Sequence, residues 1–275
     1  MGAGFGAGML VDNGISKASI GSVTDGAERL ADLPVSSTNR PGARSLNYVH
    51  VDKNDSPLKD ADMTSKHARY SRGEELANWI THGCGLLLSV AGLAVAVVIA
   101  AHRGDAWVIT SVAIYTSMLI LLYTTSTLYH AIPSLRWKQV LRKLDHAAIF
   151  LLIAGTYTPF VLVNLRGPWG WSLFGVVWAI AIAGVGFKVF FAGRFVLWSS
   201  AAYVLMGWLV LVALKPLLAA TPKSGLILLA AGGFCYTLGV VFYLWRRLAY
   251  HHAVWHLFVL AGSACHYFAV LQSVV

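Results

Sequence analysis

The chain has 275 residues, of which 57% are hydrophobic and only 12% are charged. Soluble domains carry about 25% charged residues, so this composition argues against a soluble globular protein. The net charge of +9 comes from basic breaks between apolar segments. This pattern is typical of membrane flanks and does not indicate nucleic-acid binding.

The first part of the chain differs in composition from the rest. Residues 1–75 carry nine basic and ten acidic residues, whereas residues 76–275 carry twelve basic and only two acidic ones. The early segment is rich in Gly, Ser, Asp and Asn and shows no sustained helical or strand period. We therefore expect residues 1–72 to form a disordered cytoplasmic tail and residues 73–275 to form a membrane domain.

Seven apolar runs follow the tail, each close to the 20 residues that a helix needs to cross a bilayer. Short charged breaks separate them, and tryptophans cluster near their ends, as at membrane interfaces. The sequence therefore predicts an all-α bundle of seven transmembrane helices. The expected spans are 79–101, 107–131, 145–165, 170–191, 195–214, 225–245 and 254–274.

The basic residues beside the spans predict the orientation, because lysine and arginine are enriched on the cytoplasmic side. With the N-terminus inside, eleven of them flank the inner ends. Only four flank the outer ends: Arg103, Arg166, Lys215 and Lys223. We therefore expect the N-terminus inside and the C-terminus outside. Lys188, near the end of the fourth span, is interpreted as one of the inner basic anchors.

Polar side chains from three expected spans fall at one depth. The second span ends in LYTTSTLYH, so His130 lies at the cytoplasmic edge and Ser126 lies one turn deeper on the same face. The third span begins with KLDH, which places Asp145 at that edge. The seventh begins with HHAVWH, which places His252 at the edge and His256 one turn deeper. We therefore expect these five side chains to lie in one layer.

Three imidazoles at one depth suggest a zinc site. Neutral imidazole is a common zinc ligand, and three protein ligands plus water are typical of catalytic zinc. Histidines at i and i+4 share a helix face, so His252 and His256 can supply two ligands and His130 the third. Ser126 and Asp145 are then candidate catalytic residues, which hold the ligands or the bound water without contacting the metal themselves.

Plainer interpretations remain open for the single residues. A histidine at a membrane boundary is often only a solvated helix end. Burying an unpaired carboxylate at a span boundary costs about 3 kcal/mol or more. Asp145 could therefore instead pair with Arg142 or Lys143.

Four further polar residues have their own interpretations. His82, near the start of the first span, is expected either to pack against a neighbouring helix or to assist the site. Glu75 and Asn78 stand one turn apart before that span, as at a helix start or a cytoplasmic clamp. His266 lies about three turns into the seventh span and is expected to hydrogen-bond within the bundle, away from the site.

Three groups of motifs resemble the haemolysin III family, the bacterial branch of the progestin and adipoQ receptor superfamily, which includes the adiponectin receptors. They are EELANWITHG, STLYH with KLDHAAIFLLIAGTYTPF, and HAVWH with HYF. The resemblance covers residues 73–275 and implies a multi-pass protein of a bacterial inner or plasma membrane, with the N-terminus inside. It also implies zinc on the cytoplasmic side, held by His130, His252 and His256, with Ser126 and Asp145 beside it.

The resemblance extends to function. The superfamily is similar to alkaline ceramidases, which implies a zinc-dependent hydrolase acting on an amide or ester of its expected partner, a membrane lipid. Bacterial members are named for haemolysis and linked to lipid homeostasis. This implies the alternative of a non-enzymatic channel-forming, cytolytic protein or lipid sensor with structural zinc. The fourth to sixth spans show no polar stripe, which argues against a constitutive pore or a transporter.

Overall fold

The computed structural model describes residues 70–191 and 194–275, and within these ranges the chain is helical without a β-strand. The tail predicted for residues 1–72 lies outside the described residues except for its last three. Seven helical segments are long and apolar enough to cross a bilayer, which confirms the predicted fold. They are Arg72–Arg103, Ala106–Ala131, Leu135–Asn164, Pro168–Phe191, Val196–Ala220, Lys223–Leu244 and His251–Ser273.

Two of these segments change helix type along their length. The helices are α2 (Arg72–Arg103), α3 (Ala106–Ala131), α4 (Leu135–Pro159), α5 (Pro168–Phe191), α6 (Val196–Trp208), α7 (Leu214–Ala220), α8 (Lys223–Leu244) and α9 (His251–Ser273). A π-helical turn, η1 (Phe160–Asn164), continues α4, and a 3₁₀ turn, η2 (Leu209–Ala213), joins α6 to α7.

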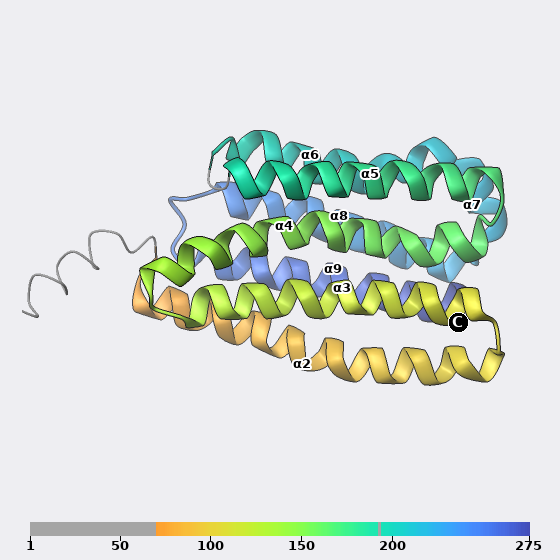
Figure 1. Ribbon diagram of the computed structural model, residues 1–275, viewed down its shortest axis with the longest axis horizontal. Helices are drawn as coiled ribbons and strands as arrows, with labels where there is room; N and C mark the ends of the chain where they lie inside the picture. Colours follow the sequence, from red (N-terminus) through yellow and green to blue (C-terminus); the bar gives the residue numbers. More distant parts are fainter. Residues whose placement is uncertain (1–69, 192–193) are drawn as a thin grey trace, which may run out of the picture. The chain divides into compact units, whose positions relative to one another are not determined.

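Helices α2 to α5 pack in chain order, and the last helix returns to the first. Helix α2 packs against α3, α3 against α4, and α4 against α5, while α9 packs against both α8 and α2 (Figure 1). The start of α2, the end of α3 and the start of α9 therefore meet at one end of the bundle. The C-terminus lies at the other end (Figure 1). Which end faces the cytoplasm stays a prediction from the basic residues.

Helix α2 begins with a complete capping box. The Ser71 side chain accepts a hydrogen bond from the Glu74 backbone N–H, and the Glu74 side chain accepts one from the Ser71 N–H. Such reciprocal bonds satisfy donors that a helix start otherwise leaves unpaired. The helix therefore starts before the apolar run expected from residue 79, and it carries Glu75 and Asn78 on its first turns.

Helix α4 also begins earlier than hydropathy predicts. It starts at Leu135, whereas the expected third span starts at residue 145, and its first turns carry the basic residues of that break. Long basic side chains reach water from a helix whose other face is buried, so charge did not end the helix. Asp145 consequently lies well inside α4, one turn after the buried Leu141, with 2% of its surface exposed.

The turn before α9 fixes where that helix starts. Tyr250 has a φ of 56°, in the left-handed region that non-glycine residues seldom occupy. Its backbone N–H donates to the Glu74 carboxylate at 3.2 Å. This bond ties the start of α9, and with it His252 and His256, to the first turn of α2.

Candidate metal centre

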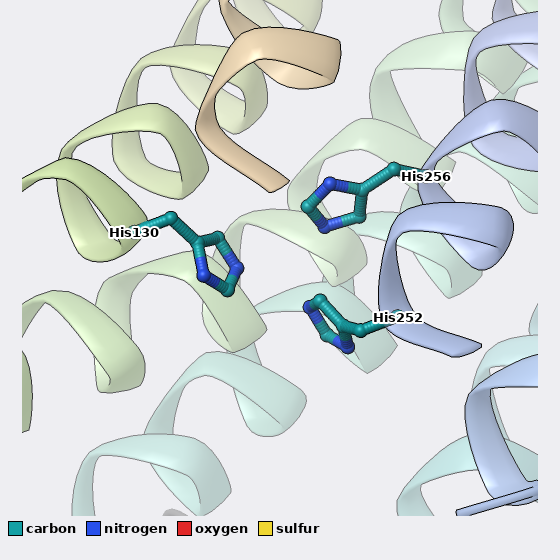
Figure 2. Close-up of side chains that lie close together, drawn as sticks. All are labelled: His130, His252 and His256. Carbon is teal, nitrogen blue, oxygen red and sulfur yellow. The ribbon is translucent and has the colours of Figure 1, made fainter. Parts of the chain in front are cut away.

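Three buried imidazoles converge at the end of the bundle where α3 ends and α9 begins. His130 comes from α3, and His252 and His256 come from successive turns of α9. One ring nitrogen from each lies within 4.8 Å of the others. Figure 2 shows these nitrogens facing a common space between the three rings. The structure thus brings together the three predicted ligands from two distant segments, at a spacing that can hold a metal ion.

The hydrogen bonds of His256 leave one nitrogen for such an ion. Its Nδ1 lies 3.1 Å from the Asn78 carbonyl oxygen and 3.1 Å from Thr81 Oγ1. Because a carbonyl oxygen only accepts, Nδ1 carries the hydrogen and Nε2 keeps its lone pair in the neutral ring. That Nε2 atom is buried without a hydrogen-bond partner, which is costly unless something binds it. The donor set therefore fits a metal.

The other two histidines are also held through Nδ1. His130 Nδ1 donates to Glu75 Oε2 at 2.6 Å, and Glu75 forms an ion pair with Lys138 as well. His252 Nδ1 lies 3.1 Å from the hydroxyl of Tyr70. Metal-ligating histidines usually bond a carboxylate, a carbonyl or another polar group through the nitrogen remote from the metal. All three rings follow this arrangement, and their partners come from α2 or from Tyr70, two residues before it.

Ser126 and Asp145 lie next to this cluster and reach it through a fourth histidine. The Ser126 hydroxyl hydrogen-bonds the Asp145 carboxylate and lies 2.7 Å from His82 Nδ1. The His82 ring stacks on the His256 ring. All of these side chains are buried. The structure therefore links Ser126 and Asp145 to the three histidines indirectly, through His82.

The alternative pairing of Asp145 does not occur. Neither Arg142 nor Lys143 forms an ion pair with it in the described part of the chain. Among the described residues, the nearest basic nitrogen is His146 Nδ1 at 3.6 Å. That nitrogen donates instead to the Arg142 carbonyl oxygen at 2.8 Å. The carboxylate is thus held by Ser126 rather than by the basic break before it.

Sequence reasoning missed the part that α2 plays. Tyr70, assigned to the tail, is 6% exposed and contacts His252, and Thr81 contacts His256. Glu75 was interpreted as a helix start or clamp, yet its carboxylate binds His130. One signal was available, because Glu75 is the last acid before a long apolar helix and costs free energy there unless paired.

A cavity lies beside the centre. Its volume is about 340 Å³, and most of its lining side chains are apolar residues of α4, α6, α8 and α9. His82 and Trp255 form part of its wall, and Trp255 packs 4.8 Å from His252 between ring centroids. Side chains that pack against the candidate ligands therefore line a mainly apolar cavity.

A seven-span membrane protein with three convergent buried histidines is the class that the fold and the site define. The family model described as haemolysin-III related matches residues 70–267, which is most of the chain. This protein belongs to the haemolysin III family, and it is a multi-pass protein of the bacterial cell membrane.

Curated relatives cover the same region. The chain is 48% identical over 198 residues to the hemolysin-3 homolog of Bacillus subtilis (strain 168), covering 72% of this chain and 93% of that one. It is 46% identical over 211 residues to hemolysin-3 of Bacillus cereus, covering 76% and 96%. It is 29% identical over 211 residues to the human monocyte to macrophage differentiation factor, covering 72% and 83%.

Proposed function

We propose that this protein is a zinc-dependent hydrolase that cleaves an amide or ester of a membrane lipid inside the bundle. One observation carries the proposal: three buried imidazoles from α3 and α9 converge within 4.8 Å, and one of them, His256, has a buried Nε2 without a hydrogen-bond partner. The Asp145 carboxylate and the apolar cavity beside this cluster supply the other requirements of such a reaction.

The ligand chemistry favours zinc among the common metals. Magnesium and calcium prefer oxygen ligands, whereas imidazole suits zinc and its neighbours in the first transition row. Three protein ligands leave a position open for water or substrate, as in catalytic zinc sites. Zinc held here supplies Lewis acidity, which activates a water molecule and polarises the substrate carbonyl.

The proton transfers fall to the side chains behind the centre. Asp145 accepts one proton from the attacking water and returns it to the leaving nitrogen or oxygen, so that the protons balance over the reaction. Ser126 holds the carboxylate through its hydroxyl, and His82 holds Ser126. The burial of Asp145 keeps bulk water away from the carboxylate.

The substrate class follows from the cavity. Its mainly apolar wall suits the hydrocarbon chain of a lipid, and about 340 Å³ is within the range of small-molecule sites. Because His82 and Trp255 line the cavity next to the histidine cluster, a chain lying there brings its polar end toward the centre.

The test combines metal analysis with turnover. We expect the purified protein to hold about one zinc ion per chain and to hydrolyse a ceramide-type amide or a lipid ester. His252→Ala and His256→Ala should lose both the metal and the activity. His102→Ala, which changes an exposed histidine at the other end of α2, is the matched control. Equal, metal-independent rates in all four proteins would rule out the hydrolase.

A second candidate rests on the names of the relatives. The Bacillus cereus relative is a hemolysin by name, which favours a channel-forming or cytolytic protein or a sensor of membrane lipid. Zinc would then be structural and would tie α3 to α9. This candidate predicts ion flux through reconstituted liposomes, or a lower melting temperature after zinc removal, without hydrolysis of any lipid. The apolar wall of the cavity suits a lipid better than an ion.

A further inference from the structure

Lys188 of α5 is buried, although its place in the sequence is typical of a membrane anchor. Only 2% of its surface is exposed, and it lines the cavity. Its Nζ atom lies 5.6 Å from the ring centre of Tyr203 and 5.9 Å from that of Phe187. The interpretation as a basic anchor reaching the membrane surface is therefore wrong, because the side chain points into the bundle.

The Lys188 ammonium has no acidic partner among the residues that the structure describes. After Glu75 the chain has two acids, Asp105 and Asp145. Asp105 caps the start of α3 by accepting from the Trp107 N–H, and Asp145 bonds Ser126. A cation in an apolar interior is strongly disfavoured unless an anion accompanies it. Among these residues, no carboxylate therefore neutralises the buried Lys188 ammonium.

Two buried hydroxyl side chains line the same cavity as Lys188. Ser199 and Ser200, both buried on α6, line the same space. Their hydroxyls donate to carbonyl oxygens of the preceding turn at 2.9 Å, which holds the two side chains against α6. They lie near the N-terminus of a 13-residue helix, where the helix dipole is positive and favours an anion.

Tyr203, which faces Lys188, connects to the histidine cluster through packed side chains. The Tyr203 hydroxyl donates to the His146 carbonyl oxygen at 2.9 Å. His146 Nε2 lies 3.4 Å from the Tyr243 hydroxyl, and the Tyr243 ring packs 5.9 Å from the His252 ring. His146, Tyr203 and Tyr243 all line the cavity. The ammonium therefore shares one cavity with His82, Tyr243 and Trp255, whose rings pack against the candidate ligands.

We propose that Lys188 binds the anionic headgroup, a phosphate or a carboxylate, of a lipid whose chain occupies the apolar part of the cavity. The missing counter-ion is then supplied by the ligand, and the apolar lining selects a lipid over a free anion. The protein thereby prefers anionic lipids over uncharged lipids with the same chains. The inference rests on the proposed function only in assigning this lipid as the substrate.

The test measures lipid binding rather than turnover. Full-length, zinc-loaded protein in phosphatidylcholine nanodiscs is titrated with phosphatidic acid, with a free fatty acid and with diacylglycerol of matched chains. We expect at least one anionic lipid to bind about tenfold more tightly than diacylglycerol, the size of a charge-assisted hydrogen bond. The phosphatidic acid and fatty acid arms distinguish a phosphate from a carboxylate headgroup.

Variants locate the preference. Lys188→Gln should abolish the preference for the anionic lipid and leave the affinity for diacylglycerol unchanged, whereas Lys188→Arg should retain it. Lys143→Gln removes an exposed lysine from the same end of the bundle and should behave like the wild type. Equal affinities for charged and uncharged lipids in the wild type, which needs no variant, would overturn the proposal. So would a preference that survives in folded Lys188→Gln.

The outcomes separate this proposal from the hydrolase. A Lys188-dependent preference without hydrolysis of any lipid refutes the hydrolase and leaves the anion site in place. Hydrolysis of an uncharged lipid without any preference refutes the anion site alone. Repeating the titration with the metal-free His256→Ala variant shows whether the preference needs the metal, and we expect it to persist there.

Discussion

The imidazole ring of His82 lies flat on that of His256, with ring centres 3.4 Å apart and 13° between the planes. His82 is 1% exposed, and its Nδ1 meets the Ser126 hydroxyl. Among the described residues, the group whose nitrogens converge within 4.8 Å contains His256 but not His82. The stack thus links a candidate ligand to the Ser126–Asp145 pair.

Replacing His82 by phenylalanine should separate these two roles. His82→Phe keeps a ring against His256 but removes the hydrogen bond to Ser126, which is worth about 1.5 kcal/mol, or roughly tenfold in rate. We expect the zinc content to stay at the wild-type level and lipid hydrolysis to slow by about that factor. Zinc analysis and turnover are measured on the same preparation.

His102→Phe changes an exposed histidine of the same helix and should leave both quantities unchanged. If His82→Phe loses zinc as completely as His256→Ala, His82 is itself a ligand and its assignment here is wrong.

Glu75→Gln should weaken zinc binding while leaving the fold intact. The Glu75 carboxylate accepts from His130 Nδ1 and thereby orients the ring and raises its basicity. Glutamine can still accept this bond but carries no charge, and changes of this kind typically cost about 10–100-fold in metal affinity. Competition with a zinc chelator measures the shift.

Asp105→Asn is the matched control, because it removes a carboxylate charge at the other end of the bundle. Asparagine also caps helices, so α3 should stay folded. Equal zinc affinities in the two variants would contradict a special role for Glu75.

The ligand positions follow from local sequence because helical spacing alone determines them. His252 and His256 differ by four residues and must share a face, and His130 ends an apolar run that can only be a helix. The seven spans were recognisable for the same reason, since their length and composition match a bilayer. Boundaries such as the start of α4 were not recognisable, because a basic turn lowers hydropathy without breaking the helix.

The partners of the histidines could not be read from the sequence in the same way. Tyr70, Glu75 and Thr81 reach the centre only because α2 packs against both α3 and α9. No short-range pattern encodes that packing. Lys188 illustrates the same limit: its position near a span end predicts a surface anchor, and only the packed bundle shows that it is enclosed.

Gly170 is where a single methyl group should destabilise the bundle. A Cβ added there would lie 2.1 Å from the Val161 carbonyl oxygen and 2.5 Å from that of Leu165, both backbone atoms of the η1 region that cannot swing aside. We expect Gly170→Ala to lower the free energy of unfolding by about 3 kcal/mol, at the upper end of overpacking costs. The melting temperature in detergent measures this.

Gly175→Ala, on the same helix, serves as the comparison because a Cβ there meets nothing within 4 Å. It should be neutral or slightly stabilising, since alanine favours a helix more than glycine does. If Gly170→Ala and Gly175→Ala have the same melting temperature, α5 and η1 lie farther apart than described.

Asp145→Asn tests whether the buried carboxylate moves protons or only supports the fold. Asparagine has nearly the same shape and can still bond Ser126, but its amide cannot accept the proton of an attacking water. General base catalysis contributes about 10²–10⁴-fold, so the hydrolysis rate should fall within that range while zinc content and melting temperature stay unchanged.

Asp105→Asn, at the α3 cap at the other end of the bundle, should retain full activity because asparagine also caps helices. If Asp145→Asn hydrolyses lipid at the wild-type rate, the proton acceptor is another group. If it loses zinc instead, the carboxylate acts by holding the centre together, and the stability of the three-histidine cluster depends on a charge that none of the three ligands contacts directly.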